Sequence, residues 1–152
     1  MAGRAAVLPA VRLLLAVLWA GSLWALGYVA APTVFGMLGT GQAGDVVGAL
    51  LARQAWIAIV CAVLLLGLAR FAPDLDAKRR RSLVIVIAAM LACALAVYLG
   101  LQPAMAHLRE LAGPAGVRAS PYWTQFAVMH GVSQLLHLVE SALGVVLVLK
   151  SR

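Results

Sequence analysis

The sequence predicts an all-α membrane protein, a bundle of four transmembrane helices, and three observations lead to this fold class. Of the 152 residues, 64% are hydrophobic and only 11% are charged, whereas a soluble domain carries about a quarter charged residues. The mean hydropathy is +1.01. The length suits about four crossings of roughly 20 apolar residues with short connections. We therefore expect a single transmembrane domain, residues 1–152, whose first partner is the lipid bilayer.

The first two helices are expected at residues 9–37 and 46–71. Pro9 suits a helix start, and the apolar run that follows is too long for a signal peptide, so we expect it to stay uncleaved. Pro32 is expected to kink or loosen the far end of this helix. The glycine-rich stretch 39–45 is expected to form the loop before the second helix.

The last two helices are expected at residues 82–110 and 121–149. A charged run, 73–81, comes before the third helix and is typical of a loop with a basic flank. Pro103 is expected to kink the third helix. The Gly/Pro-containing stretch 112–120 predicts a turn, and aromatic residues open the fourth helix, where interfacial belts lie.

The basic residues predict the orientation of the bundle, because cytoplasmic connections carry the excess of Lys and Arg. Three, Arg53, Arg109 and Arg118, fall on one side. The other nine place both termini in the cytoplasm. We do not expect nucleic-acid binding, since these charges flank apolar segments and form no separate basic patch. The nine are Arg4, Arg12, Arg70, Lys78, Arg79, Arg80, Arg81, Lys150 and Arg152.

The fourth helix carries a polar stripe within the bilayer. Its members recur at helical spacing, so they lie on one face. Ionisable groups inside a membrane normally face a bundle interior, a cavity or a ligand. The stripe is therefore the candidate functional surface. Its members are His130, Ser133, Gln134, His137 and Glu140, followed by Ser141 and Gly144.

Three interpretations of this stripe remain open. It can be a hydrogen-bonded seam that only joins helices, with contacts worth about 1 kcal/mol each. It can be a proton or ion pathway in which Glu140, His137 and His130 are successive stations. It can also contribute to a metal site, because Cys61 and Cys93 are expected near the depth of His137, and thiolate with imidazole suits Cu(I) or Zn.

The metal hypothesis needs more than one helix. His130 and His137 are seven residues apart, about 10 Å along the axis. They therefore cannot bind the same metal ion or serve as the two axial ligands of one haem. The candidate ligands, His130, His137, Cys61 and Cys93, must each find partners on other helices.

A second polar group is expected nearer the outer surface and consists of Arg53, Gln102, His107 and Arg109. These residues can form a mouth that attracts an anion or an acidic head group. Alternatively, they only snorkel to the interface. The sequence has no Gly-Xaa-Ser-Xaa-Gly, His-Glu-Xaa-Xaa-His or Cys-Xaa-Xaa-Cys pattern and no phosphate-binding glycine loop. We therefore do not expect an enzyme.

Several short stretches resemble one family over nearly the whole chain. They are residues 18–24, Gly27-Tyr28, residues 31–35, Ala43-Gly44, Leu101-Gln102-Pro103 with Arg109, and residues 129–133. In order and spacing they resemble the bacterial domain of unknown function 4149, which is similar to the transmembrane protein 205-like proteins. A looser likeness connects them to copper-resistance D-like and other haem- or metal-associated four-helix membrane proteins.

The resemblance implies a four-helix protein of the bacterial inner membrane whose relatives lack an assigned activity. It favours His130 over His137 for a shared role, because the family pattern more often has an aromatic residue where His137 stands. A haem protein of the related type would also want a histidine in the first helix, which this sequence lacks.

Two functional hypotheses follow from the sequence. The first is a small metal- or cation-handling membrane protein, linked to copper or haem metabolism, with His130 as ligand or gate and Glu140 as the compensating charge. The second is a structural or accessory subunit, a homo-oligomer or part of a larger membrane complex, in which the stripe only joins helices.

Overall fold

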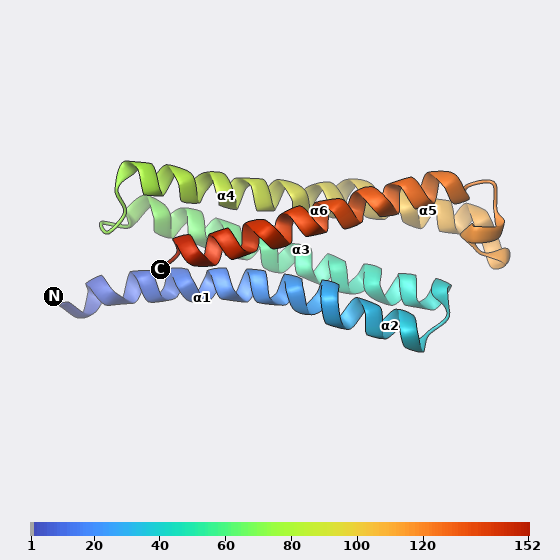
Figure 1. Cartoon of the computed structure of the whole chain (residues 1–152), viewed down its shortest axis with the longest axis horizontal. Helices are drawn as coiled ribbons and strands as arrows, with labels where there is room; N and C mark the ends of the chain where they lie inside the picture. Colours follow the sequence, from blue (N-terminus) through green and yellow to red (C-terminus); the bar gives the residue numbers. More distant parts are fainter. Residues whose placement is uncertain (1) are drawn as a thin grey trace.

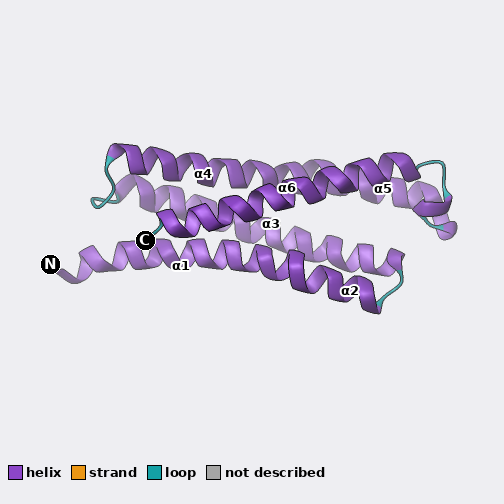
Figure 2. Cartoon of the chain, viewed as in Figure 1, coloured by secondary structure: helices purple, strands orange, loops and turns teal. Residues whose placement is uncertain are grey.

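The computed structural model describes residues 2–152, and it describes side chains from residue 7 onward. The chain forms four long helical rods, and consecutive rods run in opposite directions along the long axis of the bundle (Figure 1). Helices and short loops make up the whole described chain, and Figure 2 shows no strand in it. The predicted fold class is confirmed, because four helical segments are long and apolar enough to cross a membrane: residues 7–37, 40–71, 77–115 and 123–150.

Each of the first and third rods is built from three consecutive helical segments. The first consists of α1 (Ala2–Trp24), the π-helix η1 (Ala25–Ala30) and α2 (Ala31–Met37). The third consists of α4 (Ala77–Leu95), the π-helix η2 (Ala96–Leu101) and α5 (Gln102–Ala112). The second rod is α3 (Thr40–Phe71), and the fourth is α6 (Trp123–Lys150). Two short 3₁₀ turns, Gly113–Ala115 and Val117–Ala119, lead from α5 to α6.

Three helices begin earlier than the sequence predicts. Helix α1 begins at Ala2 and not at residue 9, so Pro9 lies inside the helix instead of starting it. Helix α3 begins at Thr40, so the expected glycine-rich loop 39–45 is wrong: most of it forms the first turns of the helix. Glycine in a helix costs about 1 kcal/mol relative to alanine, but Ala43 is fully buried here and the packing outweighs that cost. Helix α4 begins at Ala77 because the Asp76 side chain accepts a hydrogen bond from the Arg79 backbone N–H, 2.7 Å away.

A π turn comes immediately before each of the two prolines that interrupt these rods, Pro32 and Pro103. Hydrogen bonds at the ends of these turns run over five residues, from the Ala31 N–H to the Leu26 carbonyl and from the Gln102 N–H to the Val97 carbonyl. Proline has no N–H and its ring crowds the preceding turn. The wider π turn accommodates that ring, and the ribbon of these rods continues through the turn without a break (Figure 1).

The core lies in the half of the bundle that contains both termini. It is dry and built mainly from small and aliphatic side chains of all four rods, around the fully buried indole of Trp19. Small residues let helices in a membrane approach closely, and packing replaces the hydrophobic effect there. The two termini and the α3–α4 connection meet at this end (Figure 1), so this half of the bundle is closed by packing.

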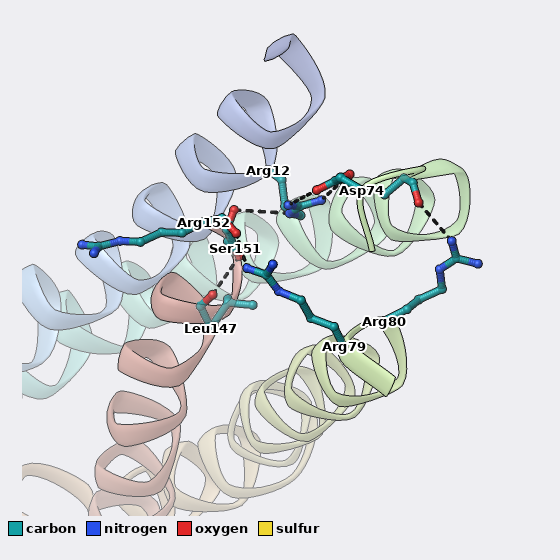
Figure 3. Close-up of polar contacts among 8 residues, drawn as sticks. Arg12, Asp74, Arg79, Arg80, Leu147, Ser151 and Arg152 are labelled. Atoms are coloured by element: carbon teal, nitrogen blue, oxygen red, sulfur yellow. Dashed lines mark hydrogen bonds and ion pairs between the residues drawn. The ribbon is translucent and has the colours of Figure 1, made fainter. Parts of the chain in front are cut away.

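A polar cluster, here called the terminal clasp, ties that end together and consists of Arg12, Asp74 and Ser151. The Arg12 side chain is only 1% exposed. Its guanidinium donates to the Asp74 carboxylate at 2.8 Å and to the Ser151 backbone carbonyl at 3.3 Å, as Figure 3 shows. The Ser151 hydroxyl donates to the Leu147 carbonyl. The clasp therefore joins α1, the α3–α4 loop and the end of α6.

The clasp predicts a dependence of stability on pH. The hydrogen bond from Arg12 lowers the pKa of the Asp74 carboxyl below its ordinary value, against the opposing effect of burial. A lowered folded-state pKa contributes stability that is full above the unfolded value of about 3.9 and is lost as pH falls through the folded value. Between about pH 5 and pH 3 the wild-type melting temperature in detergent should therefore fall more than that of Asp74→Asn. Parallel curves would contradict this.

Candidate functional site

A cavity of about 80 Å³ opens between the four rods, in the half of the bundle beyond the dry core. One water molecule needs about 10–15 Å³ on the same measure, so the cavity has room for several. Both π turns border it, through Leu26 and Gly27 of η1 and Val97 and Tyr98 of η2. Its polar lining comes from α3, η2 and α6: Gln54, Tyr98, Ser133, Gln134, His137 and Glu140.

Glu140 is the charge-bearing group of the cavity and is only 5% exposed. In the described part of the chain no Lys, Arg or His forms an ion pair with it. The Trp19 indole lies beside the carboxyl, but its Nε1 finds no hydrogen-bond partner within residues 7–152. A buried carboxylate needs a proton or a cation. The site is therefore suited to exchange one of these.

Two further polar side chains of the cavity have unused hydrogen-bonding capacity. His137 Nε2 and Gln54 Nε2 are buried, and among the described side chains neither has a partner. Such groups cost free energy unless water or a ligand pairs with them. Both residues line the cavity, and we expect water to occupy it because its wall is polar and it is large enough.

His137 is held against the first rod by a glycine. A Cβ atom built at Gly27 would overlap the His137 imidazole, including Nε2. The neighbouring Tyr28 ring meets the same imidazole edge-to-face, with ring centroids 5.5 Å apart. Gly27 therefore acts as the seat of the imidazole, and this contact requires a residue without a side chain.

The predicted stripe is divided by the structure. Ser133, Glu140, Ser141 and Gly144 are buried, and His137 is half-buried at the cavity wall. Gln134 borders the cavity from an exposed position. His130, by contrast, is exposed and does not line the cavity; its ring is nearly parallel to that of Phe126, one turn earlier on α6, at 6.2 Å. The structure thus does not bring His130 and His137 into one site.

The candidate metal ligands do not form a cluster. Cys61 is buried in the dry core. Cys93 is half-buried on α4, near enough to Glu140 for the two groups to interact. Throughout the described chain, no three His, Cys, Asp or Glu side chains lie close enough together to hold a metal ion. The sequence placed both cysteines at the depth of His137, but Cys61 packs in the dry core and neither cysteine lines the cavity with His137.

The outer polar group is also divided. Arg109 of α5 reaches the start of α3, where its guanidinium lies 3.8 Å from the Asp45 carboxylate and close to Gly44. Gln102 approaches Gly48 one turn further along α3. Arg53 and His107 are exposed, and His107 lies 4.0 Å from Glu110 on its own helix. The contacts of Arg109 and Gln102 join α5 to α3 at the end of the bundle away from both termini.

Sequence reasoning missed Gln54 and the two π turns. Expecting the second helix to begin at residue 46 put Gln54 near the membrane surface, where an amide is ordinary. The helix begins at Thr40, which places Gln54 about 21 Å along its axis, deep enough to line the cavity. The available signal was that Gln54 is the one amide in the otherwise apolar stretch 54–69 of α3.

Comparison with known proteins gives one match. The sequence model of the family described as "Domain of unknown function (DUF4149)" matches residues 14–113, about two thirds of the chain. This range covers the first rod from residue 14 and all of the second and third rods, and it leaves out α6, which supplies Glu140 and His137. No curated protein and no solved structure matches the chain.

Proposed function

Because the chain belongs to the family described as domain of unknown function (DUF4149) and is an integral membrane protein by its four apolar helices, we propose a function from its cavity. The proposal is that the protein binds a small cation, a proton included, at Glu140 and passes it along the polar wall of α6. The proposal rests mainly on the Glu140 carboxyl. This residue is 5% exposed, borders a cavity with room for water, and has no cationic partner among the described side chains.

The order of polar groups along α6 supports movement of the cation through the cavity over tight binding at one point. Glu140, His137 and Ser133 follow one another at intervals of three and four residues on α6, about 5–6 Å apart along the axis. Gln54 faces them from α3, and Tyr98 from η2. Water in the cavity bridges such distances, and chains of Glu and His inside membranes serve as relays. His130, outside the cavity, is not needed as a station.

The geometry favours a site for a proton or a partly hydrated cation over a site for a transition metal. Copper and zinc in proteins usually have three or more N or S ligands, and no such group exists among the described residues. A partly hydrated cation needs only one carboxylate and a few neutral oxygens.

The accessory-subunit hypothesis, in which the stripe only joins helices, also has less support, because few hydrogen bonds cross the stripe. Trp24 Nε1 donates to the Ser141 carbonyl, whereas the Ser141 hydroxyl has no described partner.

Replacing Glu140 with glutamine tests the proposal. Vesicles that contain the protein and a pH-sensitive dye would be given a membrane potential, and proton entry would be followed with Na⁺ or K⁺ as the competing cation. Wild-type vesicles should take up protons faster than empty ones. Glu140→Gln should reduce the rate at least tenfold, because the amide holds no exchangeable charge; an effect of this size corresponds to about 1.4 kcal/mol in the barrier.

Two controls accompany this experiment. Glu110→Gln makes the same change at an exposed position outside the cavity, and it should keep the wild-type rate. The melting temperature in detergent shows whether Glu140→Gln remains folded. Equal rates for wild type and Glu140→Gln would refute the proposal. Stoichiometric copper, zinc or a haem absorption band in gently purified protein would support the metal hypothesis instead, and a stably co-purifying protein would support the accessory subunit.

A further inference from the structure

A groove runs over the outside of the bundle between the end of α3 and the beginning of α4. It has a volume of about 570 Å³, is open to the surroundings, and lies at the end of the bundle that holds both termini. Two arginines and three apolar side chains line it: Leu66, Arg70, Phe71, Arg80 and Val84. Phe71 is 76% exposed. Because this is the last turn of a transmembrane helix, the groove passes from the hydrocarbon level to the headgroup level.

The two arginines of the groove carry positive charge that the protein leaves without a carboxylate. In the described chain Arg70 makes neither a hydrogen bond nor an ion pair. Arg80 donates one hydrogen bond, to the Ala72 carbonyl at 3.0 Å (Figure 3), and its buried Nε finds no partner among the described residues. Of the nearby acids, Asp74 pairs with Arg12 and Asp76 accepts a hydrogen bond from the Arg79 backbone; neither forms an ion pair with Arg70 or Arg80 within the described residues.

We propose that this groove is a binding site for one anionic phospholipid, with Arg70 and Arg80 on its phosphate group and an acyl chain along Leu66 and Val84. The combination of charge and apolar surface argues for this occupant. Guanidinium groups suit phosphate oxygens because they donate several hydrogen bonds in a planar fork. Basic pockets between transmembrane helices at the headgroup level take acidic lipids. Two uncompensated charges favour an anionic headgroup over a zwitterionic one.

The site is independent of the cavity proposal. It lies on the opposite side of the dry core from Glu140 and shares no lining residue with the cavity. A lipid seated here would bridge α3 and α4 beside the terminal clasp. It would add a contact between the second and third rods at the level where the α3–α4 loop crosses.

Native mass spectrometry of the detergent-purified chain with added lipid tests the site. The probes are palmitoyl-oleoyl phosphatidylglycerol and the phosphatidylcholine with the same acyl chains. The wild type should retain one phosphatidylglycerol in clear preference to phosphatidylcholine. Arg70→Gln should weaken that binding about fivefold, the factor that one basic residue near an anionic lipid surface contributes. Since the Arg70 side chain makes no hydrogen bond or ion pair within the described residues, this variant should keep its fold.

The matched control is Arg81→Gln, which removes the same charge from the neighbour of Arg80 but lies outside the groove. It should leave phosphatidylglycerol binding unchanged. An equal loss for Arg81→Gln and Arg70→Gln would mean diffuse attraction and overturn the site. Undiminished binding by Arg70→Gln would overturn it as well. So would competition by millimolar inorganic phosphate as strong as that by lipid, or a dimer in which a second copy covers the groove.

Discussion

Gly27→Ala is expected to destabilise the protein by about 1–3 kcal/mol, the range for inserting a methyl group into a packed site. The new Cβ would overlap the His137 imidazole, so the ring must leave its seat or the first rod must move away from α6. Either change disrupts the edge-to-face contact with Tyr28 and opens the cavity wall. The measurement is the unfolding free energy in mixed micelles, together with the melting temperature.

A double-mutant cycle separates this contact from a general effect of alanine. His137→Ala removes the group that would collide, so Gly27→Ala should cost little in that background, and the coupling should reach about 0.5–3 kcal/mol. Gly21→Ala on the same rod is the control, because a Cβ there meets no atom within 4 Å. It should be neutral or slightly stabilising. Identical costs for Gly27→Ala with and without the imidazole would show that the seat is not what the glycine provides.

Arg12→Met is expected to cost about 2–3 kcal/mol, the second large effect. Breaking a buried ion pair usually costs 3–5 kcal/mol, because the remaining charge is left without its partner. Water screens the Asp74 side chain, which is 34% exposed, so the cost is set below that range. The Ser151 carbonyl also loses its donor. Methionine fills much of the volume, which leaves the lost polar contacts as the cause.

A double-mutant cycle with Asp74→Asn tests whether the cost of Arg12→Met comes from the ion pair with Asp74. In that background no carboxylate is stranded, so Arg12→Met should cost less than it does alone. Lys78→Gln, an exposed change on α4 without a described contact, controls for net charge and should stay near the wild type. If Arg12→Met costs the same in the wild type and in the Asp74→Asn variant, the clasp acts through packing only.

The sequence predicted the number of helices and their order well, because long apolar runs need no knowledge of partners. It also predicted that Glu140, Ser141 and Gly144 face inward, since α6 is a single unbroken α-helix and keeps one period throughout. The same prediction was wrong for His130. Its ring is exposed and stacks on Phe126 of the same helix.

The hydrophobic periodicity of the sequence could not predict the cavity. Each π turn adds one residue to a turn and so rotates everything beyond it by about 100° relative to an ideal α-helix. A helical wheel drawn through residues 9–37 therefore assigns the wrong faces after residue 24. The burial of Arg12 was missed for a different reason: its partners, Asp74 and Ser151, are 62 and 139 residues away, and apolar patterning carries no information about such pairs.

Those separations along the chain also determine the order in which the partners of Arg12 are synthesised. When the first rod leaves the ribosome, the Arg12 guanidinium has neither of its acceptors and remains among water and lipid headgroups. The carboxylate of Asp74 is made with the second connection, and the carbonyl of Ser151 only after α6. Until then α1 is inserted but not locked. Closing the clasp thus requires the end of α6 to reach the first rod, and a nascent chain stalled before α6 is made would lack this contact on α1.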